Sequence, residues 1–377
     1  MYPSQRGYGR TSSGGYPTYQ YTYPSVTQPT NPTPMATRNA NSGSFILGGP
    51  ASSPATAGAQ RRGQCQTEIA AGGHLENDGI TYNITKQLGT GCFAEVFKAE
   101  ASKGSFNTVA IKIMPETSEC AAQLFRREAQ RLEKLKHENI VRAIDTFRFV
   151  GSQSIYTCIV LEFCEYGSIF KYIRSKKTPF MTNTVLSYTK QIASGQEYMH
   201  KRGIIHGDFK SDNILISNNG HVKISDFGHS RRFSRSTNQP PMRGGDMMYA
   251  PPEFDSSPKL DTKFDMWGFG CIVSEMSIFQ VIPAFCQGVP LFKNQSAMSK
   301  VTEQAKQAHN GLMWPLISSL FSQSAASRPS ASEVRSRVEA LESRRNSGAD
   351  GEDGPGLLRK SSSTILKMLG KKSGTEA

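Results

Sequence analysis

The chain has 377 residues, a formal net charge of +13 and seven cysteines. The cysteines are odd in number and include no Cys-x-x-Cys pair, which argues against a disulfide framework or a zinc site and favours a reducing compartment. No apolar run reaches the length of a membrane span and the first residues lack a signal-peptide core, so we expect an intracellular protein, in the cytoplasm first and the nucleus as the alternative.

The N-terminal region has an unusual composition. Residues 1–67 contain no Asp or Glu, and six of the 13 tyrosines lie within the first 23 residues, among Pro, Ser, Thr and Gly. Such a segment cannot bury enough apolar surface to offset the entropy of ordering it, so we expect residues 1–78 to be disordered. Binding of nucleic acid or formation of condensates is the alternative, but the first 60 residues hold only Arg6, Arg10 and Arg38 as basic residues, so no clear nucleic-acid site is predicted.

Strands and one helix are expected next. Residues 80–101 and 106–115 alternate apolar and polar positions and are rich in β-branched and aromatic residues, as are the runs 144–150 and 154–163. Between them, residues 120–140 have a helical period. Their apolar stripe comprises Leu124, Ala129, Leu132 and Leu135.

After Gly167 the pattern becomes mainly helical. Helices are expected over residues 182–203, 264–279 and 330–345, which carry the 3.6-residue period, and short strands around 213–216 and 221–225. This order predicts an α+β fold in which a strand-rich part precedes a helical part.

The C-terminal residues 343–377 are expected to form a disordered, basic tail. An alternative for residues 357–372 is a short helix with Ile365, Leu366 and Leu369 on one face, which would dock on a membrane or a partner.

A glycine-rich loop and a lysine suggest a phosphate site. The run "LGTGCFAEV", residues 88–96, lies between two predicted strands, where glycines let backbone N–H groups approach phosphate oxygens. Lys112 follows in an apolar strand and needs an anionic partner if its ammonium is buried, although a strand lysine can equally face solvent. Glu128 lies four and seven residues before Leu132 and Leu135, so it shares their helix face and could meet Lys112; the alternative is a surface ion pair.

A polar cluster interrupts the apolar run "GIIHGDFKSDNILI", residues 203–216. It contains His206, Asp208, Lys210, Asp212 and Asn213. The loop is either simply solvated, or it holds a metal-bound, highly charged substrate.

The motifs taken together resemble those of the eukaryotic protein kinases. In chain order they are "GTGCFA", "VAIK", Glu128, "HGDFKSDN", "DFG" (226–228), "YAPPE" (249–253), "DMWGFG" (265–270) and Arg328. The resemblance covers residues 80–342 and implies a bilobal fold, with a strand-rich N-lobe over residues 79–165 and a helical C-lobe over residues 166–342. It also implies ATP and Mg²⁺ as cofactors and protein substrates, with signalling partners possible through the tails. Lys210 is similar to the lysine of serine/threonine kinases.

The resemblance assigns catalytic and metal-binding roles to six residues. Asp208 would accept the proton of the substrate hydroxyl, and Lys210 would neutralise the transferring γ-phosphoryl group. Lys112, paired with Glu128, would contact the α- and β-phosphates. Asn213 and Asp226 would bind the metal ions.

Further residues are implied for nucleotide binding and for the interior. The nucleotide-binding set is Leu88, Gly89, Thr90, Gly91, Cys92, Phe93, Ala94, Val96, Ala110, Lys112, Glu162, Cys164 and Leu215. Among these, Glu162 and Cys164 occupy the hinge positions whose backbone pairs with adenine. Leu132, His206 and Phe227 fall where kinases stack an internal hydrophobic column, and Glu253 with Arg328 matches a buried ion pair.

The sequence departs from the kinase pattern at three positions. Gly207 replaces an arginine that normally belongs to the pocket for an activation-loop phosphate, so we expect activity that does not strictly depend on loop phosphorylation. Asp246 replaces the usual threonine, as in Wee-type kinases, and could pair with Lys210 or repel Asp208. Ala94 replaces the third glycine of the loop.

Two alternatives concern function and subfamily. A pseudokinase scaffold that binds partner proteins is the alternative to an active enzyme, although pseudokinases usually lack one or more of the catalytic residues that are all present here. The run "HGDFKSDNILIS" suggests the STE-like group, near the MAP kinase kinase kinases. Ser234, Ser347 and Ser361–Ser363 follow basic residues and are candidate phosphorylation sites, or ordinary serines of basic tails.

Overall fold

The computed structural model describes residues 42–43, 45–46, 67–91, 93–152, 154–175, 178–233, 245–255 and 261–347, all within the unit Ala40–Ala377. Most of the segments expected to be disordered lie outside the described residues. The same holds for Cys92, for Ser234 and Ser361–Ser363, and for the expected helix over residues 357–372.

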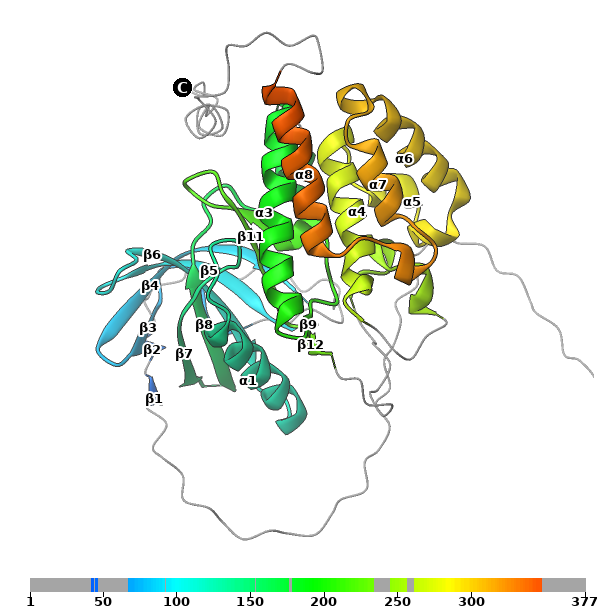
Figure 1. Ribbon diagram of the computed structural model, residues 1–377. Helices are drawn as coiled ribbons and strands as arrows, with labels where there is room; N and C mark the ends of the chain where they lie inside the picture. Colours follow the sequence, from blue (N-terminus) through cyan, green and yellow to red (C-terminus); the bar gives the residue numbers. More distant parts are fainter. Residues whose placement is uncertain are drawn as a thin grey trace, which may run out of the picture. The chain divides into compact units, whose positions relative to one another are not determined.

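The N-lobe is built on one twisted sheet (Figure 1). Its order is β1-β7-β8-β6-β5-β4-β3-β2, and neighbouring strands are antiparallel except for β1 and β7. The strands are β1 (Ser42–Gly43), β2 (Phe45–Ile46), β3 (His74–Asn77), β4 (Ile80–Thr90), β5 (Glu95–Ala101), β6 (Thr108–Pro115), β7 (Ala143–Val150) and β8 (Ile155–Glu162). Strand β3 shows that the sheet begins before residue 79, where the N-lobe was expected to start. Leu75 of this strand is fully buried in the N-lobe core.

The alternation of side chains gives this sheet two different faces. Phe97 of β5 and Ile111 and Ile113 of β6 are buried in the N-lobe core. The positions between them, among them Val96 and Lys112, lie on the opposite face and pair with each other across the two strands. That opposite face carries Lys112, the residue of the sheet on which the site is built.

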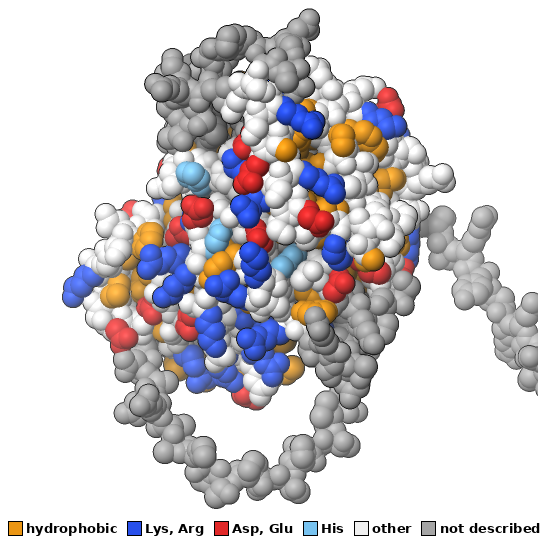
Figure 2. All heavy atoms as spheres, in the orientation of Figure 1, with side chains coloured by type: hydrophobic (Ala, Val, Ile, Leu, Met, Phe, Trp, Pro, Cys, Tyr) orange, Lys and Arg blue, Asp and Glu red, His pale blue; other side chains and the backbone are white. Residues whose placement is uncertain are grey.

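Helix α1 (Glu119–Lys134) packs against β7 and β8. Its N-cap is Ser118, whose hydroxyl accepts a hydrogen bond from the N–H of Ala121. The buried face runs through Phe125, Glu128 and Leu132. Leu124, predicted to belong to this stripe, is instead 50% exposed. The helix packs against the rest of the domain through the neighbouring Phe125, and this turns Leu124 toward solvent. Figure 2 shows Lys and Arg side chains gathered over the region of α1.

The C-lobe consists mainly of helices, with two short pairs of strands (Figure 1). The helices are α2 (Ile169–Arg174), α3 (Thr182–Lys201), α4 (Lys263–Ile278), α5 (Pro283–Cys286), α6 (Gln295–Gln307), α7 (Trp314–Leu320) and α8 (Ala331–Asn346). The short strands are β9 (Ile204–Ile205), β10 (Ile214–Ile216), β11 (Val222–Ile224) and β12 (Arg231–Arg232), paired as β10 with β11 and β9 with β12. The helices expected over 182–203, 264–279 and 330–345 correspond to α3, α4 and α8.

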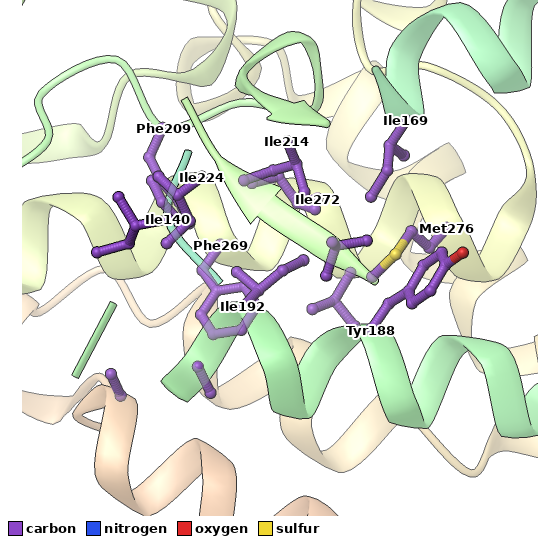
Figure 3. Close-up of a cluster of buried hydrophobic side chains, with 14 of the residues drawn as sticks. Ile140, Ile169, Tyr188, Ile192, Phe209, Ile214, Ile224, Phe269, Ile272 and Met276 are labelled. Carbon is purple, nitrogen blue, oxygen red and sulfur yellow. The ribbon is translucent and has the colours of Figure 1, made fainter. Parts of the chain in front are cut away.

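Helix α4 forms the centre of the C-lobe. All of its residues from Phe264 to Ser277 are buried, so it is buried on every side rather than on one stripe. Figure 3 shows Phe269, Ile272 and Met276 of this helix in the same cluster as Ile192 of α3 and Ile214 of β10. In the described part of the chain, no single helix is both long and apolar enough to cross a membrane.

Candidate active site

The first part of the site is an ion-pair triad centred on Lys112. Its Nζ lies 2.6 Å from Oε1 of Glu128 and 2.9 Å from Oδ1 of Asp226. The three residues come from β6, α1 and the segment after β11, so tertiary structure alone brings them together. The expected pairing of Lys112 with Glu128 is therefore present, and Lys112 does not face bulk solvent, since only 14% of its side chain is exposed.

The opposite charges of this triad stabilise the ionised forms of Lys112 and Asp226. Burial lowers the pKa of Lys112, but Asp226 and Glu128 outweigh burial and hold the pKa above its ordinary value. Lys112 in turn lowers the pKa of Asp226 well below its usual range. Burial raises the pKa of Glu128 against the pull of Lys112; we take Glu128 as ionised because the ammonium lies at hydrogen-bond distance.

The second part of the site is the loop of residues 206–213, which we call the catalytic loop after the role predicted for Asp208. Nζ of Lys210 lies 3.1 Å from Oδ2 of Asp208. Nδ2 of Asn213 donates to the backbone oxygen of Asp208 at 2.8 Å and to its Oδ2 at 3.2 Å. These contacts fix the Asp208 carboxylate, which is 7% exposed, between a cation and an amide.

Asp265 of helix α4 binds the backbone of this loop. Its carboxylate accepts the backbone N–H groups of His206 at 2.8 Å and Gly207 at 3.0 Å, and Nε2 of His200 lies 2.9 Å from it. Gly207 has φ of 80°, a conformation that glycine adopts without strain. Asp265 lies in the motif "DMWGFG", but no individual role was predicted for it from the sequence. A lone acid that opens the apolar run of α4 was the available signal, because a buried carboxylate needs donors.

Asp246 lies against the catalytic loop. Its backbone N–H donates to Oδ1 of Asp208 at 2.7 Å, and its Oδ2 lies 3.6 Å from Nζ of Lys210. Of the two contacts that the sequence left open for Asp246, the structure therefore contains the pairing with Lys210.

The residues proposed for metal binding suit Mg²⁺. Asn213 uses its amide N–H groups for Asp208, which leaves its carbonyl oxygen as an acceptor, and the carboxylate of Asp226 is 45% exposed. Among the described residues, no group of three or more His, Cys, Asp or Glu could hold a metal ion. Mg²⁺ is commonly bound by one or two protein oxygens together with phosphates and water, so this small set of oxygen donors fits that ion.

The residues proposed for nucleotide binding come from the glycine loop and from strands of both lobes. Leu88, Gly89 and Thr90 end β4, and Val96 pairs with Lys112 in the sheet. The other described members are Gly91, Phe93, Ala94, Ala110, Glu162, Cys164 and Leu215, from the glycine loop, β6, the end of β8 and β10. Phe93 is 62% exposed at the loop tip. The Glu162 side chain accepts from the N–H of Arg142 and pairs with Lys223, and the backbone N–H of Glu162 donates to the backbone oxygen of Arg142 at 3.0 Å.

One contact at this site was not foreseen from the sequence. Nζ of Lys171, on α2, donates to the backbone oxygen of Leu88 in the glycine loop at 3.1 Å. This bond joins the two lobes at the nucleotide side. A single lysine in a short helix carries no sequence signal for such a role.

Two structural features expected from the kinase resemblance are present. The rings of His206 and Phe227 lie 5.2 Å apart, and both residues, with Leu132, are buried. Arg328 donates two hydrogen bonds of 2.7 Å to Glu253, and its side chain is fully buried.

Comparison with known proteins agrees with this geometry. A family model described as "Protein kinase domain" matches residues 82–338. The chain therefore belongs to the protein kinase family, with the bilobal fold of that family.

Its relatives indicate the serine/threonine class. The chain is 29% identical over 274 residues to the serine/threonine-protein kinase Nek5 of Homo sapiens, covering 68% of this chain and 36% of that protein. It is 31% identical over 221 residues to an Aurora kinase of Schizosaccharomyces pombe, covering 58% of each. It is 32% identical over 211 residues to the cyclin-dependent kinase 9 of Homo sapiens, covering 52% of this chain and 55% of that protein. The chain thus spans only part of the length of these relatives, and their names do not support the expected place in the STE-like group.

Proposed function

We propose that this protein is an ATP- and Mg²⁺-dependent kinase that transfers the γ-phosphoryl group of ATP to serine or threonine hydroxyls of protein substrates. The observation that carries the proposal is the complete constellation: Lys112 paired with Glu128 and Asp226, and Asp208 in contact with Lys210 and Asn213. Phosphoryl transfer requires mainly positioning and compensation of charge, which these groups supply.

Each side chain then has a defined task. Asp208 accepts the proton of the acceptor hydroxyl and orients it for in-line attack. Lys210 offsets charge on the γ-phosphoryl group, and Lys112 binds the α- and β-phosphates. Asn213 and Asp226 hold Mg²⁺, which when bound neutralises phosphate charge. Leu88, Val96, Ala110 and Leu215 enclose the adenine.

We further propose that activity does not strictly require phosphorylation of the activation loop. Gly207 offers no side chain to a loop phosphate, and Asp265 already holds the backbone of this position. Treatment with a phosphatase should leave most of the activity. Complete loss of phosphate transfer after this treatment would contradict the idea.

The test of the proposed function is transfer from labelled ATP with magnesium to a generic basic protein. Wild type should transfer phosphate to serine or threonine, and Asp208→Asn should lower the rate by about 10²- to 10⁴-fold while ATP still stabilises the variant against heat. Asp255→Asn, an acid on the C-lobe surface that pairs with Lys293, is the matched control and should keep the rate. ATP binding without transfer by wild type would favour a scaffold.

A further inference from the structure

Asp246 is fixed next to the two residues that handle the acceptor hydroxyl and the transferred group. Its backbone N–H donates to Oδ1 of Asp208, and its Oδ2 lies 3.6 Å from Nζ of Lys210. Its other carboxylate oxygen, Oδ1, accepts the N–H of Met248 at 3.0 Å and so caps the turn Met247–Tyr249. Three contacts therefore hold this residue, two of them through its carboxylate, while a third of the side chain stays exposed.

The backbone around Asp246 approaches the catalytic loop closely. Gly245 has φ of 90°, and a Cβ at this position would lie 2.7 Å from the backbone oxygen of Gly207 and 3.4 Å from Oδ1 of Asp208. The 245–250 loop and the catalytic loop thus meet backbone to backbone. Asp208 and Asp246 both line a small cavity between them.

The carboxylates at this end of the site exceed the cations that pair with them. Lys210 lies within 4 Å of both Asp208 and Asp246. One ammonium therefore faces two carboxylates.

We propose that this end of the site selects acceptor segments in which a lysine or arginine lies beside the phosphorylated serine or threonine, and that Asp246 is the residue that sets the preference. The inference rests on the proposed kinase function. Its physical basis is complementarity: the exposed part of the Asp246 carboxylate attracts a basic neighbour of the hydroxyl and repels an acidic one. A threonine at this position would supply the same backbone N–H and a cap, but no charge.

The test uses three serine peptides that differ only in the residues on both sides of the serine, which are Arg, Ala or Glu. For wild type, kcat/KM should be at least about tenfold higher for the Arg peptide than for the Glu peptide, as expected for one charge–charge contact near a surface. Asp246→Asn keeps the oxygen that caps Met248 but removes the charge, and should lower the Arg-to-Glu ratio by about tenfold. Because the ratio compares two acceptors on the same enzyme, a general change in rate through Lys210 cancels.

Two further variants complete the experiment. Asp246→Lys should reverse the preference in favour of the Glu peptide, which a merely structural role would not produce. Asp255→Asn removes one negative charge from the C-lobe surface and should leave the ratio unchanged. If Asp246→Asn does not fold, Asp246→Thr takes its place, since its hydroxyl can also cap the turn.

The outcomes separate this inference from the function on which it rests. Wild type that phosphorylates all three peptides equally, or Asp246→Asn with an unchanged ratio, would overturn the inference and leave the kinase function intact. Wild type that binds ATP but phosphorylates no peptide would overturn the proposed function and the inference with it.

Discussion

Three carboxylates that are almost completely buried have three different kinds of partner. Glu128 meets the ammonium of Lys112, and Asp265 accepts backbone N–H groups of the catalytic loop. Glu275 of α4 accepts from the hydroxyl of Tyr249 and the N–H of Ile282, each at 2.7 Å. Since a buried carboxylate is costly without compensation, the partner decides which protonation state the fold favours.

Glu275 is expected to make stability depend on pH. Burial raises its pKa to about 7 from an ordinary value of 4.5, despite its hydrogen bonds. The folded state therefore holds a proton that the unfolded state has lost between about pH 4.5 and 7, so stability falls as the pH rises through this range. Glu275→Gln keeps the acceptor oxygen and removes this penalty; at pH 8 the variant should be more stable than wild type by about 3 kcal/mol, but not at pH 4.5.

Urea unfolding of both proteins across this pH range measures the effect. Glu303→Gln on the exposed side of α6 is the control and should show no such trend relative to wild type. Parallel pH profiles for wild type and Glu275→Gln would show that Glu275 is ionised in the folded protein.

At the scale of elements, α4 positions the catalytic loop through contacts of two kinds. Asp265 binds the backbone of the loop, and the ring of Phe269 lies 6.0 Å from that of Phe209, edge to face (Figure 3). Gly268, between them, lets the loop approach closely: a Cβ there would lie 2.2 Å from the backbone oxygen of Phe209. The shape of this helix, as well as its apolar character, thus determines where Asp208 lies.

Gly268→Ala should therefore destabilise the protein although alanine favours helices. The added methyl group meets backbone rather than a mobile side chain, so we expect a loss of about 3 kcal/mol or more in the free energy of unfolding, together with loss of phosphate transfer. Gly89→Ala is the control, because a Cβ at Gly89 meets nothing within 4 Å; its stability should change by less than about 1 kcal/mol. Similar stability of the two variants in thermal and urea unfolding would refute this account.

At the scale of the whole described domain, contacts between distant segments join the parts of the site. Lys112 of the N-lobe binds Asp226 of the C-lobe, and Lys171 binds the oxygen of Leu88. Far from the site, Arg328 bonds Glu253, 75 residues away, and also donates to the backbone oxygens of Ser322 and Lys263. This ion pair fixes the segment after the 245–250 loop to the end of the C-lobe.

Loss of Arg328 should cost far more than loss of an exposed arginine. Arg328→Met leaves Glu253 without its cation and several backbone oxygens without a donor, so we expect about 3–5 kcal/mol of destabilisation. Arg335→Met, which removes a 39%-exposed side chain paired with Glu197, should cost less than about 1 kcal/mol. The double variant Arg328→Met, Glu253→Gln should recover part of the loss; urea unfolding of all three tests the comparison, and equal effects of the two single arginine variants would disprove it.

Much of the architecture could be predicted because its signals are local. Alternation marked the strands around Lys112, and helical periods marked α1, α3 and α8. The sequence did not predict the short helices α2, α5 and α7, because a helix of a few residues is stabilised by packing rather than by its own pattern. Helix α6 was not predicted either. For the same reason the stripe of α1 was misjudged at Leu124, whose exposure depends on what packs beside it.

The sequence by itself determined which chemical groups are present and in what order, since spacing and residue type require no third dimension: glycine loop, Lys112, Glu128, Asp208, Asn213 and Asp226. Only the tertiary structure decided which groups meet. It placed Lys112 between two carboxylates, set Asp265 beneath the catalytic loop and brought Asp246 to Lys210. These pairings join residues far apart in the chain, and their energies depend on burial and distance, which no local pattern encodes.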